Sequence, residues 1–146
     1  MKNFSDYLLT WRSLSLHAKI KFLHATVTLI AIKTGLTILH FSTFRRLYYW
    51  LTNSGKLKDI SAFEIKETVW AVDTAANLLP FELLCLPRAL ATKYLLRKVP
   101  ALSLEIGVEI NPAKAFEAHA WVEKEGEILI GDWSESISYQ RLWVWK

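Results

Sequence analysis

A lone cysteine near the start of an expected helix is the residue best suited to covalent chemistry. Cys85 is the single cysteine of the 146 residues, and Pro87 follows it closely. Because proline is tolerated in the first turn of a helix, Pro87 indicates a helix start near Cys85. A thiol there meets the positive end of the helix dipole, which favours the nucleophilic thiolate. A lone cysteine is more often a small buried hydrophobic residue, so the position is what favours catalysis.

The candidate base is His119, within a segment of alternating residues that predicts a strand over Phe116 to Glu123. Its even-numbered residues are apolar and are expected to face the core, whereas its odd-numbered ones face the other way. Among the latter, Trp121 is a candidate substrate contact, since indole combines a large apolar surface with a polar N–H. A surface histidine without a role is the alternative that this pattern leaves open.

The candidate acid, Asp132, follows from the expected hairpin. If Glu125-Gly126 is a two-residue turn, Lys124 lies opposite Glu127, and His119 lies opposite Asp132. Directly opposed Cβ atoms are roughly 4.5–5.5 Å apart, which brings a carboxylate to an imidazole. A bulge would shift this pairing by one residue. Glu123, on the same face as His119, is the poorer orienting residue by distance.

These residues define a triad for acyl transfer. Cys85 would attack a scissile carbonyl, and His119 would accept the thiol proton and then protonate the leaving amine. Asp132 would hold the imidazole tautomer and stabilise imidazolium. The Cys85 backbone N–H is the default oxyanion donor, because amides at a helix start are free. Asn77 is a weaker candidate, since a polar residue near a helix C-terminus is the more ordinary explanation.

The elements that must position the triad form two regions, a helical one over residues 1–57 and a catalytic one over 58–146. Leu16, Ile20, Leu23, Val27 and Ile30 recur at helical spacing and indicate a buried or interfacial helix. Further helices are expected over Phe44 to Leu51, after the Ser61/Glu64 capping box, and from Cys85. Strands are expected over Ser103 to Ile110, ending in a turn at Asn111-Pro112, and over 116–123, 127–133 and 142–145.

Composition narrows the function classes. One cysteine and four histidines cannot build a typical structural zinc site, so we expect neither a metal nor another cofactor. The net charge of +4 comes from scattered basic residues, which does not indicate nucleic-acid binding. Met1 to Trp11 lacks signal-peptide features, and Phe22 to Ile32 is too short to span a bilayer of about 30 Å. Together with the single cysteine, these features favour a cytoplasmic location.

Three segments carry a specific resemblance. They are C-L-P-R-A-L-A from Cys85, I-G-V from Ile106, and F-E-A-H-A-W-V-E from Phe116. In this order and spacing they resemble the leader peptidases of lasso-peptide biosynthesis, which are transglutaminase-like cysteine peptidases. The resemblance implies an α+β papain-like/transglutaminase-like core with a Cys85, His119, Asp132 triad and an N-terminal helical extension.

The resemblance also implies a substrate and partners. Such enzymes remove the leader from a ribosomally made precursor peptide. They work with a separate leader-binding protein and an ATP-using macrolactam cyclase.

Other functions remain open at this point. The same triad serves a transglutaminase-like acyltransferase, in which an amine replaces water as the acceptor. A catalytically inactive adaptor would bind peptides through Trp121, Trp133 and the helical region. Membrane association through Leu16 to Leu39 is a third possibility, although packing on the catalytic region or on a partner is more typical of such helices.

Overall fold

The computed structural model describes residues 11–109, 116–133 and 137–146. Its helices are α2 (Leu16–Ile38), α3 (Phe41–Thr52), α4 (Ala62–Leu78) and α5 (Cys85–Leu95). Its strands are β1 (Leu102–Glu109), β2 (Glu117–Lys124), β3 (Glu127–Ile130) and β4 (Tyr139–Trp145). Ile110, the expected turn at Asn111-Pro112 and residues 1–10 lie outside the described residues.

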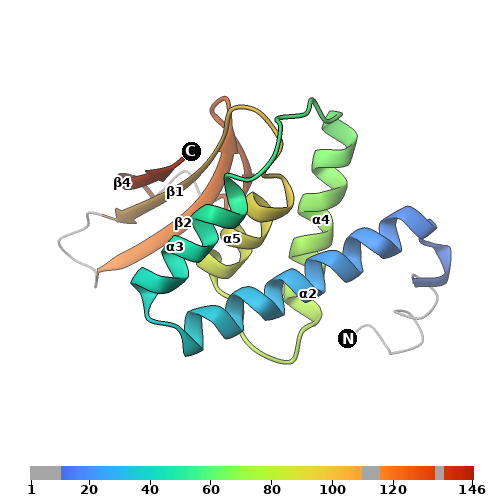
Figure 1. Cartoon of the computed structure of the whole chain (residues 1–146), viewed down its shortest axis with the longest axis horizontal. Coiled ribbons are helices and arrows are strands. Elements are labelled where there is room, and N and C mark those ends of the chain that lie inside the picture. The colour runs from blue at the N-terminus through green and yellow to red at the C-terminus, as the bar shows by residue number, and fades with distance from the viewer. Residues whose placement is uncertain (1–10, 110–115, 134–136) are drawn as a thin grey trace.

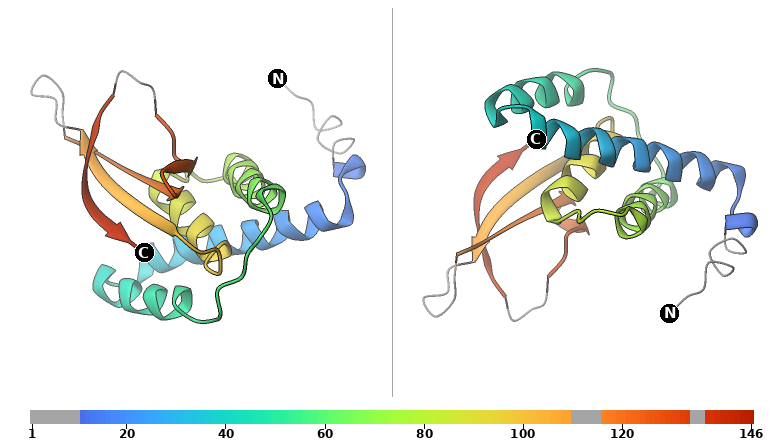
Figure 2. Two further views of the ribbon diagram at one scale, coloured as in Figure 1. Left: turned by 90° about the horizontal axis from the view of Figure 1, so that it is seen from above. Right: turned by 90° about the horizontal axis from the view of Figure 1, so that it is seen from below.

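The described strands form one antiparallel sheet in the order β3-β2-β1-β4. Helices α2 to α5 gather on one side of this sheet, with α5 lying against it (Figures 1 and 2). The expected α+β class, with a nucleophile helix packed on a small antiparallel sheet, is confirmed. None of the described helices has the length and apolar character needed to cross a membrane.

A single hydrophobic core joins the helical region to the sheet. Leu29 of α2, Tyr48 of α3, Leu90 of α5 and Leu104 of β1 belong to the same buried cluster. The Tyr48 hydroxyl donates to the Leu90 carbonyl at 2.7 Å, and burial raises the pKa of Tyr48. The division at 57/58 stays a prediction about sequence organisation, but the packing runs across it.

Helix α2 turns the expected apolar face toward solvent. Leu16, Leu23 and Val27 are 75%, 54% and 65% exposed, whereas Ala25 and Leu29 are fully buried. The helix is therefore confirmed, but burial of this face is not. The small side chain of Ala25 lets α2 approach its neighbours closely, which leaves the longer side chains outside. We call the exposed side chains of Leu16, Ile20, Leu23, Val27 and Ile30 the α2 stripe.

The local signals for α4 and α5 are confirmed. The Ser61 hydroxyl accepts a hydrogen bond from the Glu64 backbone N–H at 3.2 Å, at the start of α4. Helix α5 begins at Cys85, and Pro87 lies in its first turn, as expected. These starts are encoded by residues within a few positions of each other, which is why the sequence reveals them.

The β2–β3 hairpin has the expected turn but a different register further on. Glu125 and Gly126 have φ values of 52° and 88°, as a two-residue type I′ turn requires, and Lys124 pairs with Glu127. A bulge between Val122 and Glu123 then shifts the pairing by one residue. Strand β3 ends at Ile130, three residues before the expected end at 133.

The face of the sheet away from the helices is more buried than its polar residues suggest. Glu105, which alternation predicts to be exposed, is 2% exposed. The Ser103 hydroxyl donates to its carboxylate at 2.8 Å, and Arg141 of β4 forms an ion pair with it at 3.9 Å. Alternation within β1 alone predicts that Glu105 is exposed, but Arg141 of the neighbouring strand β4 covers its carboxylate.

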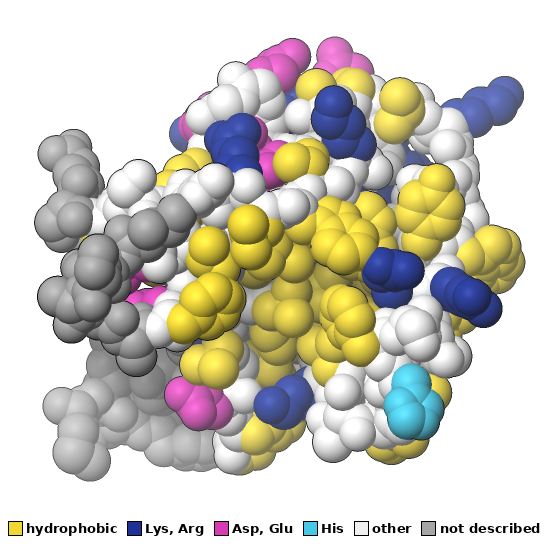
Figure 3. Space-filling model, turned by 90° about the vertical axis from the view of Figure 1, so that its left-hand side faces the viewer, with side chains coloured by type: hydrophobic (Ala, Val, Ile, Leu, Met, Phe, Trp, Pro, Cys, Tyr) yellow, Lys and Arg dark blue, Asp and Glu magenta, His cyan; other side chains and the backbone are white. Residues whose placement is uncertain are grey.

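Contacts between α3 and β4 tie the helical region to the sheet edge. Tyr48 packs on Trp145 with ring centroids 5.1 Å apart, and the Arg45 guanidinium lies 5.1 Å from the Trp143 ring centroid. The left-hand side of the molecule, where α3 and β4 lie, carries hydrophobic side chains in its middle and basic ones around them (Figure 3). Aromatic packing and a cation–π contact therefore hold α3 against β4.

Candidate active site

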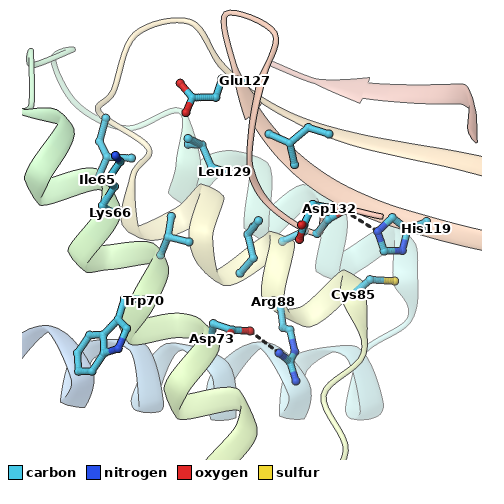
Figure 4. A pocket seen from close by; sticks show the side chains of 15 residues that line it. Ile65, Lys66, Trp70, Asp73, Cys85, Arg88, His119, Glu127, Leu129 and Asp132 are labelled. Atoms are coloured by element: carbon cyan, nitrogen blue, oxygen red, sulfur yellow. Dashed lines mark hydrogen bonds and ion pairs between the residues drawn. The ribbon is translucent and has the colours of Figure 1, made fainter. Parts of the chain in front are cut away.

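The Cys85 thiol lies at the first residue of α5, next to His119 of β2 (Figure 4). A side-chain hydrogen bond with His119 is the largest cause of a lowered pKa of the Cys85 thiol. Burial opposes this shift, while the backbone amides of Ala120 and Leu86 add to it. Because both the imidazole and the amides favour the anion, the thiolate is stabilised at the expected helix start.

The imidazole of His119 is held from its other side by a backbone carbonyl. Its Nε2 lies 2.7 Å from the carbonyl oxygen of Gly131. A carbonyl only accepts hydrogen bonds, so Nε2 carries the proton and Nδ1 is left to exchange a proton with the thiol. The pKa of His119 is raised, first by the hydrogen bond with Cys85 and further by the Gly131 carbonyl, against the effect of burial.

Gly131 adopts a backbone conformation that favours glycine. Its φ is +85°, and an added Cβ would lie 2.7 Å from the Ala120 carbonyl oxygen and 3.0 Å from the Trp121 Cβ. The chain leaves β3 at this point, and its carbonyl meets His119. The absence of a side chain at Gly131 thus allows the close approach that orients the base.

Aromatic rings surround the imidazole on the face of the sheet away from the helices. Tyr139 stacks on His119 with centroids 5.0 Å apart, and Trp133 meets it edge-on at 5.8 Å. Trp121 is 6.3 Å from His119 and 4.8 Å from Trp133. The stacked faces of Tyr139 and Trp121 favour a positive charge on the imidazole.

Trp121 packs behind His119 and is covered by its neighbours. It is 1% exposed, because its indole packs against Trp133 and donates to the Glu123 carboxylate at 3.1 Å. Gly107 makes room for this ring, since a Cβ there would lie 3.0 Å from it. The expectation that Trp121 contacts substrate stays a prediction; in this structure its side chain is covered and packs beside His119.

Asp132 lies beside the site but not in the expected cross-strand position. The bulge in the hairpin and the early end of β3 prevent the direct pairing with His119. The Gly131 carbonyl takes that place, while the exposed Asp132 side chain lines the same pocket as His119 (Figure 4). The structure thus brings the three predicted residues to one pocket and places Cys85 and His119 in contact.

The pocket that contains the thiol lies between α4 and the end of β3 and has a volume of about 600 Å³. Apolar side chains from α4 and β3 form much of its wall, among them Ile65, Trp70 and Leu129. Charged groups, including Lys66 and Asp73, also line it (Figure 4). Its size and mixed lining suit a segment of peptide.

Two other residues considered from the sequence have different partners. The Glu123 carboxylate accepts from Trp121 and, at 2.9 Å, from Arg141, so it is not oriented toward His119. The Asn77 side-chain oxygen accepts from Arg88 at 2.8 Å. Glu123 therefore holds the Trp121 indole in place, and the Asn77 oxygen is directed to the Arg88 guanidinium.

Sequence reasoning missed several residues that build the site. Gly131 precedes Asp132 directly, and glycine after a short strand is a signal of special backbone geometry. Arg88 lies three positions after Cys85 and hence on the same helix face. No local pattern indicates that Trp133 and Tyr139 flank His119, because the strand order brings them together.

Comparison with known proteins agrees with this geometry. Residues 26–144 match the transglutaminase-like superfamily, which is most of the chain. The protein therefore belongs to the transglutaminase-like superfamily, whose members use cysteine-based peptidase or acyl-transfer chemistry. No curated protein and no solved structure matches it significantly.

Proposed function

We propose that this protein is a cysteine endopeptidase that removes the leader from a ribosomally made lasso-peptide precursor. The observation that carries the peptidase part is the hydrogen-bonded pair of Cys85 and His119 in a pocket of about 600 Å³. The lasso-peptide part rests on the segments from Cys85, Ile106 and Phe116 that resemble the leader peptidases.

The proposed reaction proceeds through an acyl-enzyme. The Cys85 thiolate attacks the scissile carbonyl, and amides at the start of α5, the Cys85 N–H by default, stabilise the oxyanion. Protonated His119 gives its Nδ1 proton to the leaving amine, the C–N bond breaks, and a thioester forms. His119 then takes a proton from water, which attacks the thioester and releases the leader as a carboxylic acid while the thiol is restored.

Asp132 is the proposed third member of the triad. Its carboxylate lines the pocket, one residue after the carbonyl that holds His119 Nε2. A negative charge there stabilises the imidazolium that pairs with the thiolate before acylation and that forms again when water attacks the thioester. Catalytic hydrogen bonds often tighten only when substrate is bound, so an exposed carboxylate beside the imidazole is consistent with this role.

The α2 stripe is the proposed docking surface for a separate leader-binding protein. Its five side chains recur every three or four residues along one helix face and are 42–75% exposed. This is the pattern of a helix that packs into the groove of a partner. The partner would deliver the precursor and raise its local concentration at Cys85.

The macrolactam cyclase would act on the released core peptide. Nucleic acid and membrane contact form no part of this proposal, and a cytoplasmic location suits the reduced thiol.

The docking surface is tested by two matched variants. Val27 of the stripe and Leu57 outside it are 65% and 68% exposed, so Asp at either position costs little burial. We expect Val27→Asp to abolish the stimulation of precursor cleavage by the leader-binding protein, with unchanged basal cleavage, and Leu57→Asp to keep the stimulation. Equal stimulation of both variants would exclude the α2 stripe as the docking surface.

The reaction is tested by the masses of the products. The protein is incubated with a lasso-peptide precursor and a candidate leader-binding protein, with and without an added primary amine. We expect two peptides whose masses sum to that of the precursor plus one water, and no product from Cys85→Ala. A product that retains the amine in place of water would identify an acyltransferase, and unchanged precursor would support a binding role.

A further inference from the structure

Arg88 makes three contacts that converge just before the candidate nucleophile. Its Nε donates to the Leu83 carbonyl at 2.9 Å. Its Nη1 donates to the Asp73 carboxylate at 2.6 Å, and its Nη2 donates to the Asn77 side-chain oxygen at 2.8 Å. A single guanidinium therefore joins the last turns of α4, the segment before α5 and the first turn of α5 (Figure 4).

The start of α5 has a particular need for such a contact. Ser, Thr, Asp and Asn are the side chains that usually cap this end of a helix, but the N-cap residue of α5 is Leu84, which makes no side-chain cap bond. Leu83 is 3% exposed, so its carbonyl requires a partner within the protein. Arg88 supplies that partner, and in doing so it ties the backbone two residues before Cys85 to α4.

From this arrangement we infer that Arg88 is a positioning residue for the reaction, which rests on the proposed function of Cys85. The planar fork of arginine fixes three acceptors at once, and these set where α5 begins relative to β2. The position of the Cys85 backbone N–H and the distance of its thiol from His119 both depend on that start. A misplacement of about 1 Å in reacting groups lowers rates on the order of 10²-fold.

Replacing Arg88 by lysine tests whether the positive charge or the geometry of the guanidinium positions the start of α5. Arg88→Lys keeps a positive charge near Asp73 but loses the fork that also reaches Leu83 and Asn77. Lys21→Met is the matched control. Lys21 also joins a neighbouring helix to α4, through Glu67 at 3.3 Å and the Glu64 carbonyl at 3.0 Å, but on α2 and not on the nucleophile helix.

The readout is the pH dependence of Cys85 alkylation by iodoacetamide, which needs no substrate and is specific because the chain has one cysteine. We expect Arg88→Lys to move the midpoint upward, toward the ordinary thiol value, and to lower kcat of precursor cleavage with little change in KM. Lys21→Met should lower the unfolding temperature and leave the midpoint in place.

An unmoved midpoint in folded Arg88→Lys would overturn the inference and leave Arg88 with a structural role only. If Arg88→Lys does not fold, Asn77→Ala removes one of the three bonds and should move the midpoint in the same direction by a smaller amount; no movement would also overturn the inference. A shifted midpoint in a protein that does not cleave the precursor would uphold the positioning role and reject the proposed function alone.

Discussion

Replacing Gly131 by alanine is predicted to damage the site far more than the same change at Gly126. The two glycines have nearly equal φ values of +85° and +88°. Alanine in the left-handed region costs roughly 1–2 kcal/mol at either position. At Gly126 an added Cβ meets nothing within 4 Å, so the backbone cost is the whole effect.

At Gly131 the added atom has no room. It would lie 2.7 Å from the Ala120 carbonyl oxygen, and that backbone contact can be relieved only if the chain moves. Overpacking of this kind adds about 1–3 kcal/mol, for a total of about 2–5 kcal/mol. The movement also displaces the carbonyl that holds His119 Nε2 at 2.7 Å. We therefore expect a loss of cleavage activity on the order of 10²-fold.

Thermal unfolding and precursor cleavage measure the two effects separately. Gly126→Ala should lower the unfolding temperature by about 2–8 °C with activity unchanged. Gly131→Ala should unfold at a lower temperature still and be nearly inactive where it remains folded. Equal activity of the two variants would refute the role of the Gly131 carbonyl in orienting His119.

Three further predictions concern the thiol, the carboxylates and the indole. Because the pKa of Cys85 is lowered and that of His119 is raised, activity should rise as pH passes the thiol pKa and fall as the imidazolium loses its proton. His119→Ala should move the pH midpoint of Cys85 alkylation upward. An unchanged midpoint would show that His119 does not lower the pKa of the Cys85 thiol. Asp132→Asn should lower the cleavage rate on the order of 10²–10⁴-fold and Glu123→Gln much less; the reverse ranking would make Glu123 the supporting acid. Trp121→Ala should cost about 3–5 kcal/mol in denaturant unfolding, as for a buried ring, whereas a raised KM with unchanged stability would support the predicted substrate contact instead.

The parts of the fold that the sequence predicts correctly are those determined by neighbours in the chain. The Ser61 cap, the helix start marked by Pro87 and the turn at Glu125-Gly126 each depend on a few adjacent residues. Period-two alternation likewise identified β1 and β2, although not every exposed position in them. The candidate nucleophile and base could be found because both lie within such local patterns.

The remainder depends on packing between distant segments. Apolar residues at helical spacing predict a helix but not which face is buried, and in α2 it is the side of Ala25 and Leu29. Glu105 is buried because Arg141 and Ser103 meet its carboxylate, which no pattern in β1 reveals. The bulge after Val122 changed the partner of the imidazole from a side chain to a carbonyl. A register prediction is therefore reliable only near the turn that sets it.

The most direct test of the central claim is the mass of the intact protein during its first turnover. Wild-type protein is mixed with the precursor and the leader-binding protein and is quenched in acid at short times. Acylation predicts an adduct equal to the leader minus one water, located by peptide mapping on the segment that contains Cys85, and neither adduct nor product with Cys85→Ala. Cleavage of the precursor by Cys85→Ala, or an adduct on another residue, would contradict the account.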